Sequence, residues 1–93
     1  MIVGTLIVEL YIGEANNLKD KRRVLKSIID RIKNRYNVSV AEVGRQHTWQ
    51  RATLGIACIS NETTHVQSTL SNVAKFIESL GIAQVLAIET EII

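Results

Sequence analysis

Eight of the eleven Lys and Arg side chains in this sequence lie in one stretch, NNLKDKRRVLKSIIDRIKNRY, at residues 16–36. Only two acids, Asp20 and Asp30, lie among them, so the stretch carries a formal charge of +6 and the rest of the chain −4. Closely spaced ammonium and guanidinium groups neutralise phosphates. The composition therefore predicts an anionic partner, for which RNA or a ribosomal surface is the most direct interpretation.

A second set of residues able to contact nucleic acid follows in the segment GRQHTWQR, at residues 44–51. Arg45 and Arg51 are candidates for phosphate contacts, and Trp49 is a candidate for stacking on an RNA base. We expect a strand over residues 49–60, in which Trp49 and Arg51 point to the same face of a sheet as Thr53. The alternative is that Trp49 only packs over the edge of the sheet.

Residues suited to catalysis or metal binding are sparse. His47 and His65 stand alone, and the only cysteine, Cys58, excludes a disulfide within the chain and a Cys-rich zinc site. No phosphate-binding loop, HExxH or CxxC pattern is present. Glu89 and Glu91 share one face of the last predicted strand, where acids discourage aggregation through a sheet edge. We therefore expect no enzymatic activity, no metal and no cofactor.

The basic residues of the first stretch require a helix to position them. Asn17 precedes Asp20 by three residues, as in a capping box. Apolar side chains then recur at helical spacing, which predicts a helix of about 18 residues, and Asn37 is a candidate for a left-handed stop. The apolar positions are Val24, Leu25, Ile28, Ile29, Ile32 and Tyr36.

Five bases share one flank of this helix, about 60° to 160° from Leu25 at 100° per residue. We name them the basic ridge: Lys19, Arg22, Arg23, Lys26 and Lys33. Asp30 lies within the ridge and can pair with Lys26, four residues earlier. The three remaining bases are expected on the opposite flank: Lys21, Arg31 and Arg35.

The placement of the bases along the helix separates two interpretations. Four of them occupy the first turns, where the helix dipole disfavours cations: Lys19, Lys21, Arg22 and Arg23. A helix selected only for stability would carry acids there, so the pattern favours contact with phosphates. The alternative is a solvated helix face whose long side chains cover neighbouring apolar surface.

The rest of the chain alternates strand and helix patterns. Strands are expected at residues 2–12, 38–43, 49–60 and 83–93, and a second helix runs from a cap at Asn61 to Gly81. The order β-α-β-β-α-β over residues 1–93 predicts one α+β domain, the ferredoxin-like split β-α-β sandwich. Its antiparallel sheet has four strands, with the first and third in the centre and both helices on one face.

The sheet face away from the helices offers a competing partner. By alternation it carries the apolar side chains Ile7, Val43, Ala57 and Ile59, and also Val85. An uncovered apolar face of this kind can be buried in a homodimer, with no role for nucleic acid.

The first residues, MIVGTLIVEL, contain no basic leader, and Glu9 interrupts the apolar run. This pattern matches neither a signal peptide nor a membrane span. We therefore expect a cytoplasmic protein with no membrane contact.

The segments LKDKRRVLKSIIDRIKNRYNVSVAEV, WQRATLGIA and SNETTHV resemble the YlxP-like family of small bacterial proteins, a domain of unknown function. The resemblance covers essentially the whole chain and implies a ferredoxin-like fold. Genes of this family often lie near those of transcription, translation-initiation and ribosome-maturation factors, which implies a role near ribosomal RNA. The family supplies no catalytic residues to assign.

Overall fold

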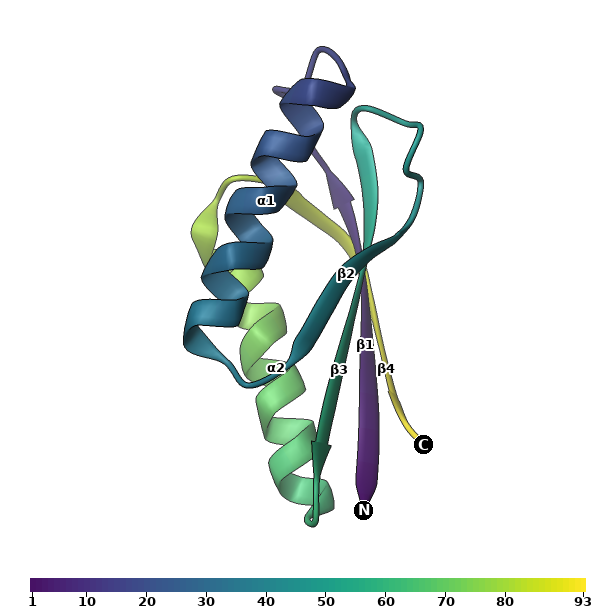
Figure 1. Cartoon of the computed structure of the whole chain (residues 1–93), viewed down its shortest axis with the longest axis vertical. Helices are drawn as coiled ribbons and strands as arrows, with labels where there is room; N and C mark the ends of the chain where they lie inside the picture. The colour runs from purple at the N-terminus through teal and green to yellow at the C-terminus, as the bar shows by residue number, and fades with distance from the viewer.

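The computed structural model describes residues 1–93 as four strands and two helices. In chain order they are β1 (Ile2–Tyr11), α1 (Leu18–Arg35), β2 (Ser39–Gly44), β3 (Arg51–Ser60), α2 (Thr63–Leu80) and β4 (Gln84–Ile92). The strands form one antiparallel sheet in the order β2-β3-β1-β4, and both helices lie on the same side of it (Figure 1). The predicted ferredoxin-like α+β fold is confirmed, with β1 and β3 in the centre.

The core forms where the alternating faces of β1 and β3 meet the apolar sides of the helices. Leu6, Val8 and Leu10 on β1 are fully buried, and each is in register with a buried residue of β3. One cluster of 17 buried hydrophobic residues joins them to both helices. Burial of an aliphatic side chain contributes about 1.5–3 kcal/mol, so this single layer between sheet and helices provides most of the stability.

The two helices differ in how their ends are capped. At the start of α1, the Asp20 N–H donates to Asn17 Oδ1 at 2.8 Å, as predicted. The expected cap at Asn61 is wrong, because α2 begins one residue later, with Glu62 at the cap position and no side-chain cap bond. Gly81 ends α2 with a φ of 65°, as expected.

The expected left-handed stop at Asn37 is also wrong. The chain leaves α1 through an extended Tyr36, whose N–H still donates to the Ile32 carbonyl. The Tyr36 ring packs edge-on against Phe76 of α2, with centroids 5.7 Å apart. This contact favours the extended exit because it holds the ring over the second helix.

Two predictions about the strands require correction. Strand β3 begins at Arg51, not Trp49, because β2 ends in a turn: Arg45 adopts a φ of 58° and its carbonyl accepts from the Thr48 N–H at 3.1 Å. Trp49 follows this turn and lies in the loop. Val85 packs against the core instead of the open face, because the register of β4 on β1 shifts between Glu9 and Leu10.

Candidate nucleic-acid interface

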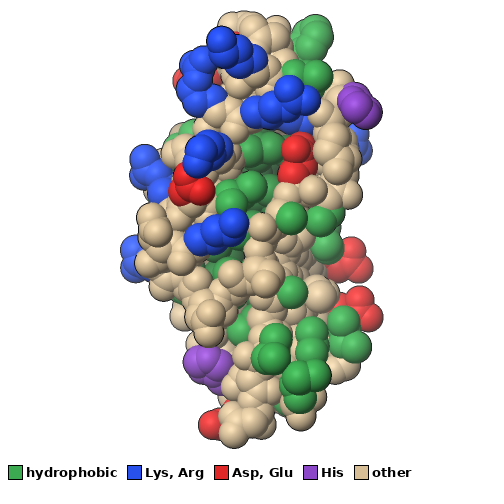
Figure 2. Space-filling model, in the orientation of Figure 1, with side chains coloured by type: hydrophobic (Ala, Val, Ile, Leu, Met, Phe, Trp, Pro, Cys, Tyr) green, Lys and Arg blue, Asp and Glu red, His purple; other side chains and the backbone are tan.

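The basic ridge lies exposed along α1, and Lys and Arg side chains gather over this helix in Figure 2. Only Lys26 has a carboxylate partner, with its Nζ 2.7 Å from Asp30 Oδ2, as predicted. The other four bases of the ridge make no ion pair and no side-chain hydrogen bond. From Lys19 to Lys33 the ridge extends about 21 Å at 1.5 Å per residue.

A shallow groove separates the middle of the ridge from β2. It has a volume of about 240 Å³, with Arg22 and Lys26 on its rim and Leu25 and Ile29 among its apolar lining residues. Asp30 and Glu42 also reach it. The groove is therefore of mixed charge, and the unbalanced positive charge lies on the outer flank of α1.

Lys21 belongs to a different environment from the rest of the basic stretch. Its side chain is fully buried, and its Nζ donates to the carbonyls of Arg45 at 2.7 Å and Arg51 at 3.3 Å. The same Nζ lies 2.9 Å from Glu42 Oε2, an ion pair outside hydrogen-bonding geometry. Lys21 thus anchors both ends of the β2–β3 loop to the first turns of α1.

The helical angles that define the ridge also indicate that this lysine is buried. Lys21 lies about 40° from Leu25 at 100° per residue, within the sector of the apolar side chains. Lys21 lies on the flank opposite the ridge, as expected, but its side chain is buried there because the loop carbonyls and Glu42 supply partners for its ammonium group inside the fold.

The β2–β3 loop carries the other predicted contacts, and they separate in space. Trp49 is 50% exposed in the loop itself. Arg45 turns toward the open face, where its Nε lies 3.4 Å from Glu9 Oε2. Arg51 is partly buried opposite Tyr11 on that face, with its Nε shielded from solvent and without a hydrogen-bond partner. Trp49 therefore lies apart from the two arginines, although Arg45 is exposed as well.

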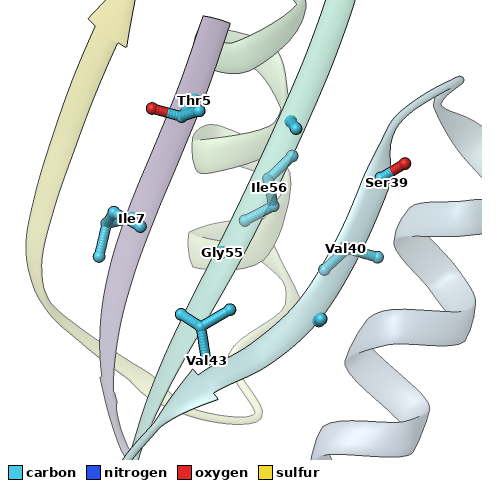
Figure 3. Close-up of a pocket in the computed structure, with 9 residues that line it drawn as sticks. Thr5, Ile7, Ser39, Val40, Val43, Gly55 and Ile56 are labelled. Atoms are coloured by element: carbon cyan, nitrogen blue, oxygen red, sulfur yellow. The ribbon is translucent and has the colours of Figure 1, made fainter.

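The open face of the sheet is apolar in the middle and acidic at the β4 edge. A depression of about 300 Å³ lies between β1, β3 and β2, with Ile7 and Val43 among its lining residues (Figure 3). A Cβ on Gly55 would lie 2.9 Å from Val43 Cγ1, so a larger residue here would displace the Val43 side chain. Glu89 and Glu91 stand beside Ile7 and Thr5 in register, which makes the face unsuited to phosphates.

At the far end of α1, Arg35 joins the two helices. Its guanidinium lies 5.0 Å from the centroid of the Phe76 ring, and the Tyr36 hydroxyl donates to the Asn72 carbonyl at 3.4 Å. Such cation–π stacking is worth about 0.5–1 kcal/mol at exposed sites. Arg35 thus has a structural contact within the fold, whereas four of the five ridge bases, all but Lys26, have none.

No group of three or more His, Cys, Asp or Glu side chains is placed to hold a metal ion. Neither helix is long and apolar enough to cross a membrane.

The strand order and the helices on one face define the class: a ferredoxin-like α+β domain. A solved structure described as "De novo designed protein Foldit4" has this fold, with a TM-score of 0.55 and 17% identity over 100% of this chain and 97% of that one. At that identity the likeness concerns the fold alone.

Sequence comparison then identifies the family. The profile of "Protein of unknown function (DUF503)" matches residues 3–90, and the chain belongs to this family. "Uncharacterized protein YlxP" of Bacillus subtilis (strain 168) is 42% identical over 78 residues, which span 84% of this chain and 85% of that protein. The YlxP-like resemblance is thereby confirmed, and neither description states an activity.

Proposed function

We propose that this protein binds RNA, free or on a ribosomal surface, through the basic ridge of α1. The observation that carries the proposal is that Lys19, Arg22, Arg23 and Lys33 are exposed without any partner in the protein. Bases that stabilise a fold contact carboxylates, carbonyls or rings, as Lys21 and Arg35 do here. Unpaired bases in a row provide the electrostatic footprint that phosphates neutralise.

The helix dipole gives a second argument, in a narrower form than the sequence suggested. Lys21 has an internal role, so its place in the first turns needs no external ligand. Lys19, Arg22 and Arg23 remain there with one acid, Asp20, which already accepts from the Asn16 N–H. Cations at this end destabilise a helix, and binding of phosphate would compensate for that cost.

The proposal is one of binding and not of catalysis. The ridge provides only cations, and no nucleophile or general base with a hydrogen-bonded partner accompanies them. A role with RNA or the ribosome would place the protein in the cytoplasm.

The test compares two triple variants of equal charge. Arg22, Lys26 and Lys33 are replaced by Gln in the first, and Arg31, Arg35 and Lys75 in the second, because Gln keeps helix propensity. RNA affinity is measured by fluorescence anisotropy over a salt series. The ridge variant should flatten the slope of log K against log salt by about 0.7 per lost contact on single strands. Thermal unfolding checks that both variants remain folded.

Two outcomes would contradict the proposal. If the ridge variant binds with the wild-type affinity and salt slope, the ridge is a solvated helix face. If both triple variants weaken binding equally, net charge and not the ridge attracts RNA. Phosphate contacts carry no sequence information, so the sequence preference should change little.

A second candidate function is a homodimer formed through the open sheet face. It is favoured by the apolar depression and by Val43 and Ile59, which are 53% and 63% exposed. The four strands have ten, six, ten and nine residues and cover roughly 550 Å². Two copies would therefore bury roughly 1,100 Å², just below the range of standard specific interfaces. The acids Glu89 and Glu91 at its edge oppose pairing of identical faces.

Light scattering of the wild type and of Ile7→Lys tests this candidate. Ile7 stands beside Glu89 in register, so the new ammonium group has a carboxylate within reach and the variant should fold. A dimer through this face should become a monomer, whereas an unchanged mass would remove the face from consideration.

A further inference from the structure

Trp49 is the only tryptophan of the chain, and its indole has no partner in the fold. It makes no ring–ring or cation–π contact, and half of its surface is exposed. A depression of about 350 Å³ lies against it, lined by His47, Thr48, Trp49 and Gln50. A large aromatic side chain left exposed in a polar loop offers a flat surface to a ligand that stacks.

The loop that carries Trp49 is held at both ends. Lys21 Nζ binds the carbonyls of Arg45 and Arg51, and the Ile12 N–H donates to the Gln50 carbonyl at 2.8 Å. The Gln50 side chain donates in turn to the carbonyls of Gly13 and Ala15 at 3.4 Å each. Because these contacts order the loop before any ligand binds, stacking on Trp49 requires little further loss of conformational freedom.

The same contacts place the loop beside the basic end of α1. Lys21 lies in the first turns of that helix. Lys19, Arg22 and Arg23 are at most two residues from it in the chain, which is about 3 Å along the helix axis. The loop and the N-terminal end of α1 meet at one end of the molecule (Figure 1). A strand bound across this end of the molecule would pass both the N-terminal bases of the ridge and the loop that carries Trp49.

We infer that the RNA bound by this protein is single-stranded, with one unstacked base lying on the indole of Trp49 while the ridge holds the neighbouring phosphates. The inference rests on the proposed function. In a duplex the bases are stacked on one another and their faces are hidden, so only an unpaired base can occupy this position. Stacking tolerates any base, so the preference is for single strands and not for a sequence.

The experiment uses three variants at one position and two forms of one RNA. Oligonucleotides of a single sequence are offered single-stranded or annealed to their complement, and binding is followed by anisotropy and by quenching of Trp49 fluorescence. Trp49→Phe keeps an aromatic ring, Trp49→Leu keeps only bulk, and Trp49→Ala keeps neither.

Single-stranded RNA should quench the wild-type fluorescence, and duplex RNA should not. Trp49→Ala and Trp49→Leu should weaken single-strand binding about 5- to 150-fold, with Trp49→Phe close to the wild type and duplex binding unchanged in all three. The salt slope should stay at the wild-type value, because no phosphate contact is lost.

The outcomes separate this inference from the proposed function. If the ridge variant lowers the salt slope but Trp49→Ala binds single strands as well as the wild type, the stacking inference is wrong and the ridge proposal stands. If Trp49→Leu binds as well as Trp49→Phe, bulk and not a ring is needed, and stacking is also overturned. If the wild type binds neither RNA, both proposals fail.

Discussion

The inner and outer sides of α1 carry the same kind of side chain in opposite situations. On the inner side Lys21 is fully buried, and its ammonium group meets two carbonyls and a carboxylate. On the outer side Arg22, its neighbour in the chain, is exposed and meets no acceptor. A run of basic residues can therefore contain both a structural lysine and bases that have no partner in the fold. A count of charges does not distinguish the two.

Substitution of Lys21 should give the largest effect and test the comparison most directly. Lys21→Met keeps a long unbranched side chain but removes the ammonium group, so Glu42 loses its counter-charge and two loop carbonyls lose their donor. Loss of one member of a buried ion pair costs about 3–5 kcal/mol. The free energy of unfolding, measured by urea denaturation, should fall by that amount. Arg22→Met, as the control, should change stability by less than about 0.5 kcal/mol.

A double variant isolates the cause of that loss. Replacing both Lys21 and Glu42 by Met removes the uncompensated carboxylate, so part of the stability should return. A cost below about 1 kcal/mol for Lys21→Met alone would be too small for a buried pair, and the inner and outer sides would then not differ as described.

The regular parts of the fold could be predicted from the sequence because each buried position repeats with the period of its element. The alternation of Leu6, Val8 and Leu10 and the helical spacing of Leu25, Ile28 and Ile32 locate the core that the structure contains. The predicted central strands are also confirmed: β1 and β3, the two long apolar strands, each have a neighbouring strand on both sides.

The features that the sequence did not predict depend on contacts between distant segments. Lys21 meets carbonyls 24 and 30 residues away, and a lysine at the margin of an apolar helix face ordinarily reaches solvent. Trp49 was predicted to lie in β3 because it continues the alternation of that strand. The turn between Arg45 and Thr48 instead leaves Trp49 in the loop, and β3 begins at Arg51. Val85 changed face because of a register shift, which alternation within one strand does not reveal.

The two helix starts offer a smaller effect with a built-in control. The Asn17 side chain accepts the Asp20 N–H at 2.8 Å, whereas Asn61 lies outside α2 and its helix has no side-chain cap. Asn17→Ala should therefore lower the free energy of unfolding by about 1 kcal/mol. Asn61→Ala should change it by less than about 0.5 kcal/mol. Equal losses at both positions would mean that the cap at Asn17 contributes little.

The smallest expected effect concerns the ridge itself, and its sign is opposite to the others. Arg22 and Arg23 lie in the first turns of α1, where the partial positive charge of the helix end repels them. Replacing both by Gln should stabilise the free protein by about 0.3–1 kcal/mol at low salt. The gain should vanish near 1 M salt, where the Debye length is only about 3 Å.

Lys33 provides the matched control, because it lies in the last turn of the same helix, where the dipole attracts a cation. Lys33→Gln should lower stability slightly at low salt, while also weakening RNA binding if the ridge is the interface. Thermal unfolding at two salt concentrations gives the sign of the stability change for Lys33→Gln and for Arg22→Gln/Arg23→Gln. If Arg22→Gln/Arg23→Gln lost stability instead, these bases would have a partner in the fold, and the reason for assigning them to an external phosphate would disappear.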